Sequence, residues 1–256
     1  MSAKVRLGGM ALSNGVLVHG PSAWACAIRT DEGAIKIVSA RKRVLAQKVN
    51  QPFLRGPIRL VEAFAFLPEL RRRLPEARLP FERPGILAAA LASAVSVHVV
   101  RRSDRVGGAA GELLSGALSL APALMALRGG ELANYHGAEH VTIGTYEHDE
   151  PRAKEHERCG SHLIGPLLAA SAAGNALAGR APAHLRGTAR LASSVGAVGV
   201  AVEVFGWMTR HPRHPLSKAL AFPGHELQHR LATAEPTPQQ LEVAEAALAA
   251  CLELEA

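Results

Sequence analysis

The chain has 256 residues, a formal charge of +7, only 4% aromatic residues and a mean hydropathy of +0.09. Its three cysteines stand singly, which excludes a disulfide framework and favours a reducing compartment. Fifteen of the twenty-nine lysines and arginines precede residue 85, but no aromatic residues interleave with them, so no nucleic-acid partner is expected.

The first region, residues 1–84, is predicted to be basic and cytosolic and to contain a β-hairpin. Large and small side chains alternate over residues 24–28, and the alternation resumes at Ile35 and Ile37 after a turn that contains Asp31 and Gly33. A period of two on both sides of such a turn is typical of paired strands.

Four apolar segments follow, at residues 85–100, 106–127, 163–179 and 191–208. A membrane-spanning helix needs about twenty apolar residues, and two of these segments are near the lower limit. We predict a mainly α protein whose membrane region comprises two helical hairpins, at 85–127 and 163–208. The alternative is a soluble, alanine-rich helical bundle.

Two hairpins would return residues 1–84, 128–162 and 209–256 to one side of the bilayer. The basic start of the chain favours the cytoplasm for that side. The expected location is therefore the inner, cytoplasmic membrane, crossed several times, with both termini cytoplasmic. The lipid bilayer is the expected partner, together with other membrane proteins.

The most informative motif is H-x-x-E-H at residues 136–140, in the predicted cytosolic segment 128–162. On a helix, His136 and His140 stand one turn apart on the same face, so two imidazoles can bind one ion. In one class of zinc hydrolases this order pairs two histidine ligands with a glutamate that activates water, which is the role predicted for Glu139.

Two histidines do not complete a zinc site, and His156 and Cys159 are the nearest further candidates. All four residues together would form a closed, structural site, whereas three would leave a position open for catalysis. Glu147 and Glu203 are the acidic alternatives for a third ligand. Imidazole and thiolate ligands favour zinc over magnesium as the metal.

The C-terminal region 209–256 contains two further patterns. His225, Glu226 and His229 match H-E-x-x-H, which we interpret as a chance match in a chain with twelve histidines. Thr237 and Gln240 form a predicted capping box, and an amphipathic soluble helix is expected to follow it.

Several segments together resemble the DUF1385, or YqhQ-like, family of bacterial and plastid membrane proteins. The residues that match are Gly8-Gly9, Ala11 and Gly15-Val16, Pro52 to Gly56 with Glu62, Tyr135 to His140 with Thr142-Ile143 and Tyr146-Glu147, His156 to Ser161, and Pro223-Gly224, Gln228, Thr233, Glu235-Pro236 and Glu242 to Ala244. The resemblance implies a membrane setting and a metal-dependent enzyme with no assigned reaction. Tyr135 and Arg158 become further site candidates by this resemblance alone.

The chain differs from the family pattern at four polar positions, which are Asn14, His19, Val141 and His162. Two functions are therefore carried forward, and the sequence leaves open whether the protein is an enzyme. The first is an integral membrane protein with a cytoplasmic zinc-like site that hydrolyses an unknown substrate. The alternative is a non-enzymatic accessory protein whose polar segments dock a larger membrane complex.

Overall fold

The computed structural model describes residues 4–42, 51, 53, 58, 61–62, 64–103, 106, 108–127 and 130–256. The chain begins with a four-stranded antiparallel sheet in the order β1-β2-β3-β4. Its strands are β1 (Gly8–Leu12), β2 (Gly15–His19), β3 (Ala23–Arg29) and β4 (Ile35–Arg41). The predicted hairpin is confirmed as β3 and β4, whose turn contains Gly33 at a φ of 86°. The sequence did not predict β1 and β2.

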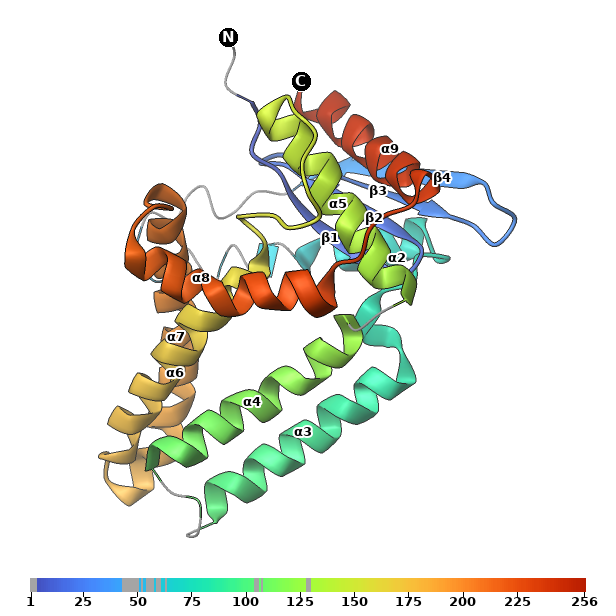
Figure 1. Ribbon diagram of the computed structural model, residues 1–256. Helices are drawn as coiled ribbons and strands as arrows, with labels where there is room; N and C mark the ends of the chain where they lie inside the picture. The colour runs from blue at the N-terminus through green and yellow to red at the C-terminus, as the bar shows by residue number, and fades with distance from the viewer. Residues whose placement is uncertain are drawn as a thin grey trace.

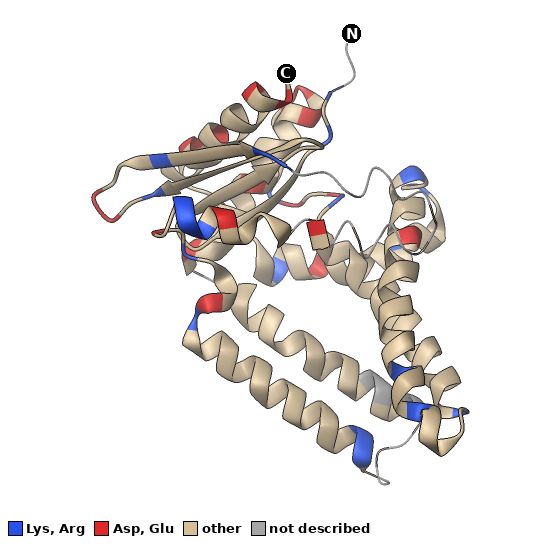
Figure 2. Ribbon diagram, turned by 180° about the vertical axis from the view of Figure 1, so that it is seen from behind, with Lys and Arg blue, Asp and Glu red and all other residues tan. Residues whose placement is uncertain are grey.

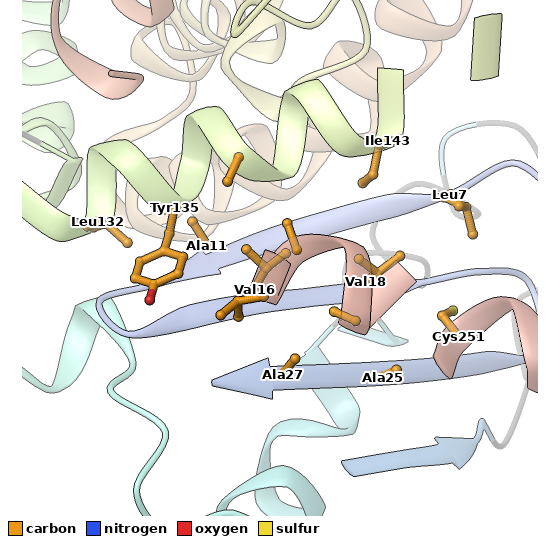
Figure 3. Close-up of a cluster of buried hydrophobic side chains, with 14 residues drawn as sticks. Leu7, Ala11, Val16, Val18, Ala25, Ala27, Leu132, Tyr135, Ile143 and Cys251 are labelled. Atoms are coloured by element: carbon orange, nitrogen blue, oxygen red, sulfur yellow. The ribbon is translucent and has the colours of Figure 1, made fainter. Parts of the chain in front are cut away.

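Both faces of the sheet are covered by helices (Figure 1). Side chains at Val16, Val18, Ala25 and Ala27 pack against α5 (Gly130–His148) and α9 (Pro238–Glu255), as Figure 3 shows for α5. The alternate positions, which are Leu17, Trp24, Cys26 and Ile28, pack on the other face with α2 (Leu67–Arg73) and the residues after it. Successive side chains of a strand point to opposite faces, so both sets are buried.

The C-terminal helix α9 begins as the sequence predicts. Thr237 accepts a hydrogen bond from the backbone N–H of Gln240, and the Gln240 side chain accepts one from the Thr237 N–H, which completes the capping box. The apolar face of α9 is buried at Val243, Ala244, Ala247 and Cys251. The last helix of the chain therefore shares one hydrophobic core with the first strands.

All four apolar segments are helical and pair as two hairpins. The first hairpin consists of α3 (Pro84–Arg102) and α4 (Gly108–Leu127), and the second of α6 (Ile164–Gly179) and α7 (Arg186–Arg210). Both hairpins extend away from the sheet, and the two termini lie at the opposite end of the molecule (Figure 1). Helix α8 (Pro215–Leu227) and the π-helical turn η5 (Gln228–Ala232) lead back toward the sheet.

Two helical segments are long and apolar enough to cross a membrane. The first is Pro84–Arg102, and none of its most apolar 18-residue stretch is buried. The second is Ala183–Arg210, in which 22% of the corresponding stretch is buried. On α3 an exposed apolar stripe runs at four-residue intervals through Leu87, Leu91, Val95 and Val99. Helices α4 and α6 are not among these candidates. The two predicted helical hairpins are therefore confirmed, whereas a four-helix membrane region is not.

Candidate metal centre

Helix α5 carries the H-x-x-E-H motif in the geometry that its spacing predicts. The His136 and His140 rings lie on one face with their centroids 4.4 Å apart. Between them, Gly137 lets the helix approach the segment that follows η5, because a Cβ at this position would lie 3.3 Å from the Ala234 carbonyl carbon. The same contact is fixed by a hydrogen bond from the Ala234 N–H to the Ala133 carbonyl at 2.9 Å.

Backbone carbonyls set the orientation of both imidazoles. The Nδ1–H of His136 donates to the Ala232 carbonyl at 2.8 Å, and the Nδ1–H of His140 donates to the Lys154 carbonyl at 2.6 Å. A carbonyl cannot donate, so each Nδ1 carries the proton and each Nε2 keeps its lone pair. Fixing a histidine ligand through its second nitrogen in this way is usual in metal sites.

Cys159 completes a three-residue group, which we call the His–His–Cys cluster. Its Sγ lies 3.7 Å from the His136 Nε2, and the potential ligand atoms of His136, His140 and Cys159 all lie within 4.8 Å of one another. Among the residues that the structure describes, this is the one group of three or more such side chains with that proximity. Two imidazoles and a thiol are a donor set suited to zinc.

The ionisation of the cluster is consistent with a metal site. The pKa of His140 is lowered to about 2, mainly by burial and to a smaller extent by nearby His136. Its imidazole is therefore neutral at neutral pH and able to bind a metal. Burial raises the pKa of the Cys159 thiol. A metal ion bound by Cys159 would therefore displace a proton, because the thiolate is the ligand form.

Glu139 lies beside the cluster and is buried between α5 and β1. Its side chain packs on Gly9, where a Cβ would lie 2.6 Å from the Glu139 Cγ. The residue is 7% exposed, and no hydrogen-bond donor of the described residues reaches its carboxyl group. Burial raises the pKa of Glu139 to about 7, an effect that His136 opposes and Cys159 increases. This carboxyl group is available to exchange a proton.

His156 lies next to the cluster but is not a member of it. Its ring centroid is 5.5 Å from that of His140, yet both of its nitrogens have other partners. Nδ1 accepts from the Arg158 backbone N–H at 3.2 Å, and Nε2 donates to Glu147 at 3.2 Å. Glu147 also pairs with the Arg158 guanidinium. Three of the four predicted ligands therefore lie together, while His156, Glu147 and Arg158 form an adjoining polar network.

Gln228 holds the loop that carries Cys159, and sequence analysis gave it no role beyond its match to the family tail. Its side-chain oxygen accepts from the His156 backbone N–H at 2.8 Å, and its Nε2 donates to the Ser161 hydroxyl at 2.7 Å. The side chain is fully buried. A buried amide with both groups satisfied fixes the loop at two points on either side of Cys159.

The remaining predicted residues lie elsewhere. Tyr135 is on α5 but faces the sheet core, where it is 4% exposed. Glu203 is on α7 and accepts a hydrogen bond from the Phe53 backbone N–H at 3.4 Å. Most of the predicted 52–56 motif lies outside the described residues. His229 of the second zinc-like string pairs with Glu155, and Glu226 pairs with Arg230.

A pocket of about 270 Å³ is lined by His156, Glu147 and Arg158 of the polar network beside the cluster. Its wall includes Arg6, Glu147, His156 and Arg158, together with Lys4 and Arg152. It is the space among the described residues from which a small polar molecule can approach the network next to the cluster.

Comparisons with known proteins match the part of the chain that contains the cluster. Residues 131–254 match a family model described as "Protein of unknown function (DUF1385)". Over these residues, the chain is similar to the DUF1385 family. The matched region contains the whole His–His–Cys cluster, Glu139 and Gln228. No solved structure matches the chain.

One curated relative is the "Uncharacterized protein YqhQ" of Bacillus subtilis (strain 168), which is 34% identical over 130 residues. That match covers 48% of this chain and 41% of the relative, so the likeness concerns less than half of the relative's length. Two departures from the family pattern lie outside the cluster. Asn14 holds the backbone of residues 76–78 through its amide, and His19 contacts Lys42 at 2.9 Å.

Proposed function

We propose that this protein is a membrane-embedded hydrolase that depends on a zinc-like metal ion. The observation that carries the proposal is the cluster of His136, His140 and Cys159, in which each Nδ1–H donates to a backbone carbonyl and the potential ligand atoms lie within 4.8 Å of one another. Such precise orientation of two imidazoles toward one point is characteristic of a binding site. If these histidines were only polar residues at a helix end, nothing would require both imidazoles to lie next to the Cys159 thiol.

Three protein ligands are the number that catalytic zinc sites commonly use, with one position left open. A metal ion held here would act as a Lewis acid and favour the deprotonation of water at neutral pH. Glu139 would accept that proton, since its carboxyl group adjoins the cluster and has no hydrogen-bond donor of its own among the described residues. Gln228 would keep the Cys159 loop in place during the reaction.

Replacing Glu139 by Gln tests the hydrolytic part of this proposal, because it removes the base and keeps the shape. We expect zinc-loaded wild-type protein to hydrolyse a member of a panel of chromogenic carboxylic esters, phosphate esters and amides. We expect Glu139→Gln to retain zinc but to lose about 100-fold or more in rate. Equal rates would contradict the role of Glu139, and a zinc-loaded protein with no hydrolysis would favour the accessory function.

The membrane part of the proposal rests on the exposed apolar surface of the hairpins. Leu91 is 71% exposed on α3 and Leu191 is 68% exposed on α7, and a soluble protein seldom exposes a continuous apolar stripe of this kind. Both hairpins would span the bilayer and leave the sheet, the metal centre and the two termini in the cytoplasm. The basic N-terminal region supports this orientation.

Washing membranes with alkaline carbonate measures this embedding. We expect the full-length protein to remain in the pellet, because the apolar faces of α3 and α7 would otherwise meet water. Introducing Asp at Leu91 and Val95 should release a large fraction into the supernatant, whereas Asp at the exposed position Arg72 should not. Release of the wild-type protein from the membrane in this wash would contradict the proposed membrane embedding. It would not contradict the proposal of a metal centre.

A further inference from the structure

A second pocket lies far from the metal centre, between the ends of α3 and α7 that are remote from the sheet. It has a volume of about 450 Å³ and is lined by Ala94, Val97, His98, Arg101, Arg102 and Arg190. Four of these six residues are histidine or arginine, and three of them carry a permanent charge. The pocket is therefore suited to an anion. The chemistry proposed for the His–His–Cys cluster does not require an anion at this place.

Arg190 supplies independent evidence for a ligand. Its Nε is buried and has no hydrogen-bond partner among the described residues. A buried donor without an acceptor destabilises a protein, and a charged donor does so more strongly than a neutral one. The position of this nitrogen in the wall of a cationic pocket indicates that an acceptor from outside the chain completes the site.

The surroundings of the pocket are cationic. Residues 84–103 and 160–202 contain no aspartate or glutamate, while Arg180 and Arg186 lie near the same end of the second hairpin. Asp104 and Arg105 follow directly after α3 and lie outside the described residues. Figure 2 shows blue segments at this end of the two hairpins. Glu112 is on the adjoining helix α4, and its side chain is outside the part that the structure describes. Arg102 has no acidic partner among the described side chains.

Apolar surface leads directly to the pocket. The exposed stripe of Leu91, Val95 and Val99 runs along α3 to the turn that bears Arg102, and Ala94 and Val97 form part of the pocket wall. An anion that also carries long apolar chains would pair with Arg102 and Arg190 and cover this stripe. Guanidinium groups bind phosphate oxygens in a bidentate manner, so a phosphate ester is the anion they suit best.

We propose that this pocket binds the phosphate group of an anionic phospholipid whose acyl chains lie along α3. The proposal rests on the membrane embedding proposed above, but not on the metal centre or its chemistry. The lipid binds where the helical shafts meet the bilayer surface, which is the depth at which arginine side chains and lipid phosphates coincide.

Native mass spectrometry of the detergent-purified full chain tests the proposal. The probes are phosphatidylglycerol, phosphatidylcholine and inorganic phosphate. The test variant combines Arg102→Gln with Arg190→Gln. The matched control combines Arg83→Gln with Arg210→Gln, which removes two exposed arginines from the opposite ends of the same two helices. Arg190→Lys is a milder variant that keeps the charge and removes the Nε donor.

We expect wild-type protein to bind phosphatidylglycerol at least about tenfold more tightly than phosphatidylcholine. The test variant should lose about tenfold in affinity for phosphatidylglycerol, Arg190→Lys should lose about threefold, and the control should remain within about twofold of the wild type. Equal affinity for the two lipids, or equal losses in test and control variants, would overturn the proposal.

Inorganic phosphate distinguishes a lipid from a soluble ligand. We expect it to compete only weakly, because it cannot cover the apolar stripe of α3. If inorganic phosphate bound as tightly as phosphatidylglycerol, the ligand would be a soluble phosphate and not a lipid. That result would overturn the proposal. A protein that stays in the carbonate-washed membrane but shows no preference for phosphatidylglycerol would contradict this pocket alone.

Discussion

Purified protein is expected to contain about one zinc ion per chain, and the His136→Ala, His140→Ala double variant less than about a tenth of that amount. The reason is that both imidazoles already direct a free Nε2 toward Cys159, so little reorganisation opposes binding. Cys159→Ser should weaken zinc binding without abolishing it, because a hydroxyl is a poorer ligand than a thiolate. Elemental analysis of detergent-purified protein measures the zinc content of the wild type, the double variant and Cys159→Ser.

The chain provides a matched control for this experiment. His225 and His229 have the same spacing of four residues on a helical segment, yet they do not belong to the cluster. We expect the His225→Ala, His229→Ala variant to retain the full zinc content. Zinc absent from the wild type, or lost equally from both double variants, would show that the H-x-x-E-H segment is not a metal site.

Gly9→Ala should have the second largest effect, although it adds one methyl group to a strand remote from Glu139 in sequence. The new Cβ would lie 2.6 Å from the Glu139 Cγ, and both elements are held by the sheet core. Either the carboxyl group moves away from the cluster or α5 moves away from β1. Overpacking of this kind destabilises a core by about 1–3 kcal/mol. Chemical unfolding followed by the fluorescence of the buried Trp24 reports the change.

A double-mutant cycle separates the two causes. If the clash is with the carboxyl side chain, Glu139→Ala should restore most of the stability lost in Gly9→Ala, and the interaction energy should be about 1 kcal/mol or more. Gly85→Ala is the control, because nothing lies within 4 Å of its added methyl group and the residue is in a helix. Additive effects of Gly9→Ala and Glu139→Ala would contradict direct packing between the two positions.

The sequence predicted those elements whose pattern is local. The alternation at residues 24–28 and 35–37 identified β3 and β4, and the capping box identified the start of α9. Strand β1 was missed because Gly8, Gly9 and Ala11 are small, so side-chain size shows no period of two. Strand β2 was missed because Val16, Leu17 and Val18 form an uninterrupted apolar run. Their pairing becomes evident only when α5 and α9 cover one face of the sheet.

The candidate site was predictable in part for the same reason. A spacing of four residues placed His136 and His140 on one face of a helix, but spacing alone could not choose between His156 and Cys159. That choice depends on the loop between α5 and η3 (Gly160–Leu163), which Gln228 holds from 72 residues further along the chain. Contacts over such separations leave no periodic signal in the sequence.

The hydrogen bond between His136 and Ala232 also has a consequence for biosynthesis. The carbonyl that orients this imidazole lies 96 residues downstream, after both helical hairpins. While the ribosome is still translating the second hairpin, His136 lacks the partner that fixes its tautomer, and Gln228 has not yet been made to hold the Cys159 loop. The metal centre therefore forms only after the second hairpin has been made, and a nascent or truncated chain that ends before residue 228 cannot form it in this geometry.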